Sequence, residues 1–217
     1  MRTARFLQMR REAYGFALGS LCFLVGATPL YADAVGAVVA NATFAVGSVL
    51  FTGAALLQLL LSGRRPPRAA SSRADAYDWW AAAIQLGGTV LFNVSTFRAW
   101  RAAVARPDEV GVGWTADAWG SLAFLVSSAL ALAALSRRHE LWDVLARTPG
   151  AVWLNAAGSV AFGASAAGAY VVPATDELLS LWWTLFGTWL GALCFLVAAV
   201  LTRPSVTAPE ERAGISG

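Results

Sequence analysis

The stretch that decides the fold is Phe44–Gly53, FAVGSVLFTG, which lies inside the uncharged run Ala34–Gly63. A run of this length can cross a bilayer, which needs roughly 17–25 apolar residues. Backbone polar groups in the bilayer core must bond internally, so we expect the run to be a helix. Within it, Gly47 and Phe51 are four residues apart and therefore share one helix face. The glycine leaves room for a neighbouring helix, and the phenylalanine supplies a side chain to fill the adjacent space.

The rest of the chain has the same character. Of 217 residues, 58% are hydrophobic and 13% are charged, and the mean hydropathy is +0.58. A soluble domain carries about 25% charged residues. We therefore predict an all-α membrane protein with six transmembrane helices. The six uncharged runs that predict them are Ala13–Ala32, Ala34–Gly63, Trp79–Phe97, Ala118–Ser136, Thr148–Thr175 and Leu178–Thr202.

Several kinds of chemistry are excluded by composition. All 16 basic residues are arginine, so no lysine can form a Schiff base with retinal or pyridoxal phosphate. A Walker phosphate loop also needs lysine. Cys22, Cys194 and His139 are far apart in the sequence and form no nucleophile or metal-ligand motif. We therefore expect no enzyme, cofactor or metal site.

The arginines predict the orientation in the membrane. Thirteen lie in the N-terminal segment, the second and fourth connections and the C-terminal tail. Basic residues are enriched in cytoplasmic loops, so both termini are predicted to be cytoplasmic. The opposite side carries only Arg98, Arg101 and Arg106.

The first run permits a second interpretation. Arg10 and Arg11, followed by the apolar run and Ala32-Asp33-Ala34, resemble a signal peptide with a cleavage site. Cleavage would leave five spans. We favour six, because the first run shares a motif with the other runs.

That motif is Gly-[Ser/Thr]-x-x-Phe, and it occurs once in each of the first five runs. Glycines of alternate runs are about 70 residues apart, which predicts three tandem helical hairpins, at about 13–63, 77–136 and 148–203. In lipid, helices associate by such close packing, so we interpret the motif as a packing element. Its positions are Gly19, Ser20 and Phe23; Gly47, Ser48 and Phe51; Gly88, Thr89 and Phe92; Gly120, Ser121 and Phe124; Gly158, Ser159 and Phe162; and, with Gly191 in place of phenylalanine, Gly187 and Thr188.

Hairpins with an aromatic residue before Gly-Ser-x-x-Phe resemble the YrhK-like domain family of small bacterial membrane proteins. The stretches that carry the resemblance are Phe44–Phe51, FAVGSVLF, and Gln85–Asn93, QLGGTVLFN. The resemblance implies a helical, multi-pass protein of the bacterial inner (plasma) membrane. It implies no particular activity, substrate or catalytic residue.

One polar stripe remains to be explained. In the third run, residues 85, 89, 93 and 96 fall on one helix face, and two residues of the fifth run have a matching register. We favour interhelical hydrogen bonds as the role of these residues. The alternative is a small polar cavity between the third and fifth helices. The residues are Gln85, Thr89, Asn93 and Thr96, with Asn155 and Ser159.

Outside the spans, three segments are predicted to lie in the cytoplasm. Residues 1–12 form an amphipathic N-terminal segment, and Ser136–Pro149 lies in the headgroup layer. Residues 204–217 form a disordered tail. The expected partners are the lipid bilayer and, at the cytoplasmic face, anionic lipids that meet the arginines. A homo-oligomer remains open, and no nucleic acid is expected.

The expected function follows from these features. We predict a non-enzymatic membrane protein that acts through helix packing, assembly or partner binding. The alternative is a transporter or channel for a small solute or ion. Asp117, the acidic residue closest to a span interior, is expected at the outer end of the fourth span, beside Trp114.

Overall fold

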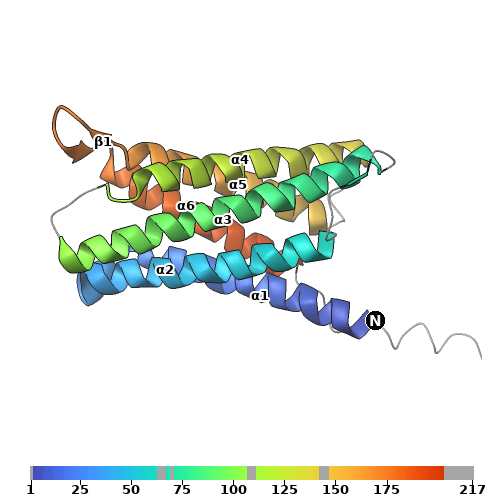
Figure 1. Ribbon diagram of the computed structural model, residues 1–217, viewed down its shortest axis with the longest axis horizontal. Coiled ribbons are helices and arrows are strands. Elements are labelled where there is room, and N and C mark those ends of the chain that lie inside the picture. Colours follow the sequence, from blue (N-terminus) through green and yellow to red (C-terminus); the bar gives the residue numbers. More distant parts are fainter. Residues whose placement is uncertain (1, 63–66, 69–70, 107–110, 142–146, 203–217) are drawn as a thin grey trace, which may run out of the picture.

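The computed structural model describes residues 2–62, 67–68, 71–106, 111–141 and 147–202, and all structural statements below refer to these residues. They form a bundle of six long helices that lie side by side (Figure 1). A two-stranded antiparallel hairpin, β1 (Val171–Val172) with β2 (Glu177–Leu178), connects the last two helices. The helices are α1 (Arg2–Gly26), α2 (Pro29–Ser62), α3 (Arg73–Ala105), α4 (Trp114–Arg137), α5 (Arg147–Gly168) and α6 (Leu181–Thr202).

The predicted all-α architecture is confirmed. Among the described residues, α2, α4 and α6 are each long and apolar enough to cross a membrane. The other three helices carry more polar residues. In α3 several of these are buried in the bundle, among them Thr89, Ser95 and Thr96.

The helices form a closed ring. Consecutive helices pack as the pairs α1/α2, α3/α4 and α5/α6, and these pairs meet along α2/α3, α4/α5 and α1/α6. Each helix therefore has two main neighbours. One side of each helix faces the central axis of the ring, where the buried phenylalanines gather.

The first predicted boundary was wrong. The run Ala13–Ala32 is not one helix, because α1 ends at Gly26 and α2 begins at Pro29. Proline at the first helical position is favourable, since the missing N–H has no partner there in any helix. Within α2, Gly36 has φ +79° and ψ 164°, which breaks the regular helix and favours glycine.

The boundaries of the fifth and sixth runs also differ from the prediction. Helix α5 ends at Gly168, before the predicted end at Thr175, and α6 begins at Leu181 instead of Leu178. The residues between them form the β hairpin, in which Val171 pairs with Leu178. Apolar β-branched residues extend an uncharged run without extending the helix, so hydropathy alone does not separate the two.

The predicted flanking segments are partly described. Residues 2–12 are the beginning of α1 and continue into its apolar part without a break. In the predicted segment Ser136–Pro149, α4 continues to Arg137 and α5 starts at Arg147. The central part, 142–146, and the tail, 204–217, lie outside the described residues.

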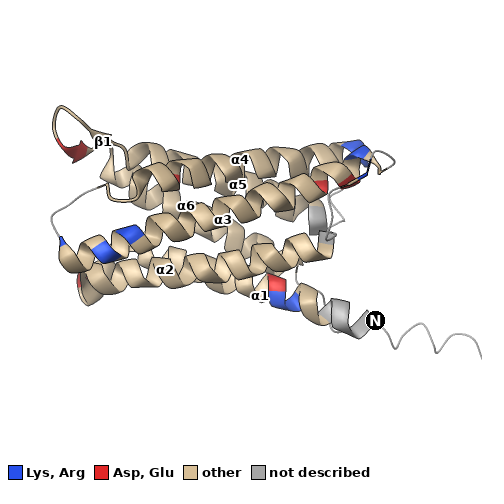
Figure 2. Ribbon diagram, in the orientation of Figure 1, with Lys and Arg blue, Asp and Glu red and all other residues tan. Residues whose placement is uncertain are grey.

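Charged residues are concentrated toward the ends of the helices (Figure 2). At the end of the bundle where the chain starts, called here the N-terminal end, Arg138 contacts Asp75 and Asp78. Arg98 and Arg101 of α3 are exposed toward the opposite end. A mostly uncharged middle with charged ends is typical of helices embedded in lipid.

Candidate functional site

The Gly-[Ser/Thr]-x-x-Phe motif forms a reciprocal contact between α1 and α2. A Cβ atom built on Gly19 would lie 2.9 Å from Cδ2 of Phe51, and one built on Gly47 would lie 2.9 Å from Cδ2 of Phe23. The carbonyl oxygen of each glycine is also 3.0–3.1 Å from the Cβ position of the other. Each glycine therefore makes room for the ring and the backbone of the partner helix.

Helices α3 and α4 make the same contact. The Cβ position of Gly88 lies 2.8 Å from Cδ1 of Phe124, and that of Gly120 lies 3.1 Å from Cδ2 of Phe92. Four motif residues thus form one interlocked unit in each of these two hairpins.

The third pair corrects the predicted register of the sixth helix. In α5 and α6, the Cβ position of Gly158 lies 3.2 Å from Cδ1 of Phe195, and that of Gly191 lies 2.7 Å from Cδ2 of Phe162. The motif in α6 is therefore Gly191–Phe195, GALCF, one turn beyond the predicted Gly187-Thr188. It contains phenylalanine after all, and alanine replaces the hydroxyl residue.

Gly187 lies one turn before the motif position of α6 and also packs closely against α5. Its Cβ position lies 2.6 Å from the carbonyl oxygen of Ala161 and 2.9 Å from Cβ of Ser165. It is therefore a close-packing glycine that faces α5, one turn away from the motif position. The hydroxyl of Thr188 shares a 2.7 Å hydrogen bond with that of Ser165.

Ser48 and Ser159, at the second motif position, link neighbouring hairpins. The Ser48 hydroxyl shares a 2.9 Å hydrogen bond with that of Thr96, between α2 and α3. The Ser159 hydroxyl shares one of 2.9 Å with that of Ser128, between α5 and α4. All six residues at this position are at most 2% exposed: Ser20, Ser48, Thr89, Ser121, Ser159 and Ala192.

The motif phenylalanines meet at the axis of the ring, one from each helix. Phe23, Phe92 and Phe162 contact one another, with ring centroids 5.8–6.2 Å apart. Phe195 contacts Phe51 and Phe124 at 6.1 and 5.7 Å. We call this set of six rings the phenylalanine layer.

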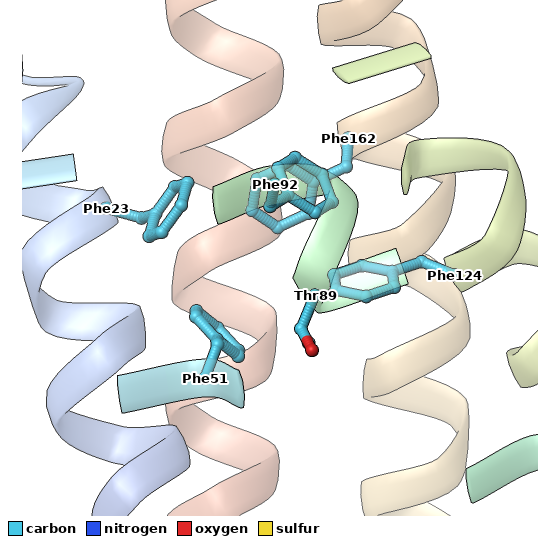
Figure 3. Close-up of a pocket in the computed structure, with 6 residues that line it drawn as sticks. All are labelled: Phe23, Phe51, Thr89, Phe92, Phe124 and Phe162. Atoms are coloured by element: carbon cyan, nitrogen blue, oxygen red, sulfur yellow. The ribbon is translucent and has the colours of Figure 1, made fainter. Parts of the chain in front are cut away.

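The phenylalanine layer leaves almost no free space (Figure 3). Five of its rings surround a void of about 10 Å³, together with Thr89 of α3. This is close to the smallest volume that holds one water molecule. The Thr89 hydroxyl donates to the carbonyl oxygen of Leu86 at 2.8 Å, so the void offers water few polar partners.

On the N-terminal side of the layer lie two adjoining cavities, called here the amide cavities. Their volumes are about 90 Å³ and about 320 Å³, and both are lined by Gln58, Gln85 and Asn155. Phe51 and Phe195 of the layer line the smaller one.

An ion pair lies at the mouth of the larger amide cavity. Asp75 and Asp78 line this cavity, and Arg138 approaches both carboxylates, with Nη2 at 3.2 Å from Asp75 Oδ1. Hydrogen bonds from Ser72 and Arg138 hold the pKa of Asp75 below its usual value. The hydrogen bond to Asp78 raises the pKa of Arg138.

On the other side of the layer lies a third cavity, of about 250 Å³, called here the Asp117 cavity. Asp117 is in the first turn of α4, as expected, and all six helices contribute to the lining. Phe23, Phe92 and Phe162 form its boundary with the layer. The sequence had indicated the carboxylate but not the cavity that it faces.

The predicted polar stripe divides into two parts. Gln85 accepts a hydrogen bond from Ser127 of α4 at 3.3 Å and lines the amide cavities with Asn155. Farther along α3, Asn93 donates to Thr52 of α2 at 2.8 Å.

The stripe is therefore not a single lining between the third and fifth helices. Thr96 faces α2 through its bond to Ser48, and Ser159 faces α4. Thr89 belongs to the void in the phenylalanine layer. Helical periodicity predicts which residues share a face, but not which helix covers that face.

Comparisons of the chain with family models, with curated proteins and with solved structures find no match. The resemblance to the YrhK-like domain family therefore stays a prediction from the motif. Among the described residues, no group of three or more His, Cys, Asp or Glu side chains is arranged to hold a metal ion.

Proposed function

We propose that the protein is a multi-pass protein of the bacterial inner membrane in which all six helices span the bilayer as three tandem hairpins. Both termini face the cytoplasm. Its role is non-enzymatic and depends on helix packing, assembly or partner binding. The observation that carries the proposal is the phenylalanine layer, to which every helix contributes one ring.

Two further observations support six spans. Helices α1, α3 and α5 pack lengthwise against α2, α4 and α6, the three helices apolar enough to span a membrane alone. Polar residues that lower the hydropathy of α3, such as Thr89 and Thr96, are buried against other helices. Buried, hydrogen-bonded polar side chains are compatible with a membrane helix, because lipid does not contact them.

Cysteine labelling tests the topology. Cysteine introduced at Asp33 or Thr175 should react with a membrane-impermeant maleimide added outside spheroplasts. Cysteine at Arg68 or Glu140 should react only in inverted vesicles. All four positions are exposed in the structure. Labelling of position 68 or 140 from the same side as position 33 would rule out the six-span arrangement.

The background for this labelling can be free of native cysteine. Cys22 and Cys194 contact the glycines of the neighbouring helices through their Cβ atoms. Alanine keeps these atoms, so Cys22→Ala and Cys194→Ala should leave the bundle intact. The protein without native or introduced cysteine, treated with the same maleimide, measures the background of the labelling.

A second candidate function is the passage of a small solute or ion along the axis. The phenylalanine layer lies between the smaller amide cavity and the Asp117 cavity, since its rings line both of them. Both cavities are lined by α3. Gln85 lines the smaller amide cavity on one side of the layer, and Ser95, farther along the helix, lines the Asp117 cavity on the other side. A ring of apolar side chains between wet cavities can act as a gate by excluding water.

Gln85→Leu separates the two functions. If Gln85 lines a solute pathway, the flux of urea, glycerol or methylammonium into proteoliposomes should fall at least tenfold, with little change in thermal stability. If Gln85 only packs, flux should follow the amount of folded protein.

Asn93→Leu is the matched control for this experiment. Asn93 bonds to Thr52 between helices and lines none of the three cavities described above. The change should therefore reduce stability by about 0.6–2 kcal/mol and leave the flux per folded molecule unchanged. A wild-type flux equal to that of empty liposomes for all three solutes would contradict the passage function.

A further inference from the structure

The Asp117 cavity holds a carboxylate without a compensating charge. Among the described residues, Asp117 has no ion pair and no side-chain hydrogen bond, and no arginine or histidine lines the cavity. The side chain lies three residues before Gly120, which corresponds to about 4.5 Å along the helix axis. It is therefore close to the phenylalanine layer.

An unpaired carboxylate in such a place is costly. A charged group removed from water needs a partner of opposite sign or several hydrogen-bond donors. The location of Asp117 in the first turn of α4 supplies part of the compensation for its charge, because a helix N-terminus favours negative charge. A cation bound in the cavity would supply the rest.

Most of the hydroxyl groups that line the cavity already donate to carbonyl oxygens of the protein. Ser165 donates to the carbonyl oxygen of Thr184 at 2.7 Å, and Thr96 donates to that of Phe92 at 2.8 Å. Thr188 donates to the carbonyl oxygen of Thr184 at 2.9 Å. The lining therefore offers few free donors for an anion or a sugar, and too few oxygen ligands for a dehydrated metal ion.

Aromatic side chains form much of the remaining wall. Phe23 and Phe44 lie edge to face, with centroids 5.3 Å apart, and Phe92 and Phe162 close the cavity toward the layer. The Trp114 indole N–H donates to the carbonyl oxygen of Ala166 at 2.8 Å, which fixes this ring in place. Aromatic rings next to a carboxylate are the combination that binds organic ammonium ions, through cation–π attraction and charge pairing.

We propose that the Asp117 cavity is a binding site for a small organic ammonium ion. The charged nitrogen pairs with the Asp117 carboxylate, and its methyl or methylene groups contact Phe44 and Phe162. The cavity volume of about 250 Å³ suits a ligand of only a few carbon atoms. Binding does not require passage through the phenylalanine layer, so this proposal stands apart from both candidate functions above.

Calorimetry on the detergent-purified protein tests the proposal without any variant. Choline, tetramethylammonium and methylammonium are titrated, together with the neutral isostere of choline in which carbon replaces the nitrogen. We expect saturable binding of at least one ammonium ion, and at least tenfold weaker binding of the neutral isostere. Equal affinity for choline and its isostere would overturn the proposal, as would the absence of binding by all three cations.

Two carboxylate variants locate the site. Asp117→Asn should weaken ammonium binding at least tenfold. Glu12→Gln removes the carboxylate that lines the smaller amide cavity and should leave the affinity unchanged. Undiminished binding by Asp117→Asn would place the site elsewhere and overturn the proposal, and so would sodium or potassium chloride binding to the wild type as tightly as choline.

Discussion

Phe162→Ala is expected to lower the free energy of unfolding by about 3–5 kcal/mol, the usual cost of truncating a buried phenylalanine. Phe162 is 3% exposed, and its ring contacts four others of the layer, at centroid distances of 5.5–6.3 Å. Lipid supplies no hydrophobic drive for helix association, so lost van der Waals contacts are not compensated. Unfolding of the purified protein by titration with a denaturing detergent measures the change.

The control for this substitution is Phe97→Ala. Phe97 is on α3, is 39% exposed and belongs to no layer contact. Its truncation should cost less than 1 kcal/mol, in the range of surface substitutions. A similar loss for both variants would show that the phenylalanine layer is not the centre of the packing.

Gly88→Leu should abolish most of the folded yield, whereas Gly87→Leu should not. A Cβ on Gly88 would lie 2.8 and 2.9 Å from ring atoms of Phe124 and 3.1 Å from Cβ of Ala123, so a leucine must push α3 and α4 apart. The Cβ position of Gly87 has no neighbour within 4 Å. Overpacking of this kind costs about 1–3 kcal/mol or more.

The two adjacent glycines form a matched pair. Both substitutions add the same side chain to the same helix, so membrane insertion and helix propensity change equally. The yield of monodisperse protein after gel filtration is the measurement. Equal yields would mean that the motif glycines are dispensable for packing in this bundle.

Much of the packing could be predicted from the sequence. The spacing of Gly47 and Phe51 predicts that both lie on a contact face, because residues four apart share one side of a helix. The structure adds that the contact is reciprocal, which requires knowing the level at which two antiparallel helices cross. The height at which the two helices cross depends on the loop between them and on their close contacts. The helical periodicity of the sequence does not determine it.

The register of α6 illustrates the limit. Gly187 and Gly191 are one turn apart on the same face, and both lie close to α5. The threonine after Gly187 favoured the first of them by analogy with the other helices. Only the contact of Gly191 with Phe162 identifies the second as the motif position.

The candidate site was harder to predict than the fold. Gln85 and Asn155 were identified from their equal distance to the motif glycine, and both line the amide cavities. Asn93 makes an interhelical hydrogen bond to Thr52 of α2, which is the favoured interpretation of the stripe, but it does not share the cavity surface with Gln85. The Asp117 cavity could not be predicted, because it depends on which residues of six helices meet at one point.

The contact between Phe23 and Phe162 tests the central claim most directly, because these residues come from the first and third hairpins and meet only if the ring closes around its axis. Their ring centroids are 6.0 Å apart in an edge-to-face arrangement. In a nanodisc sample that is deuterated except at phenylalanine rings, nuclear Overhauser spectroscopy should detect a cross-peak between the two rings. Single Phe→Leu variants assign the signals. Cross-peaks of Phe23 to both Phe92 and Phe162 are the predicted result. Cross-peaks of Phe23 only to Phe44 and Phe51, its neighbours within the first hairpin, would contradict the phenylalanine layer.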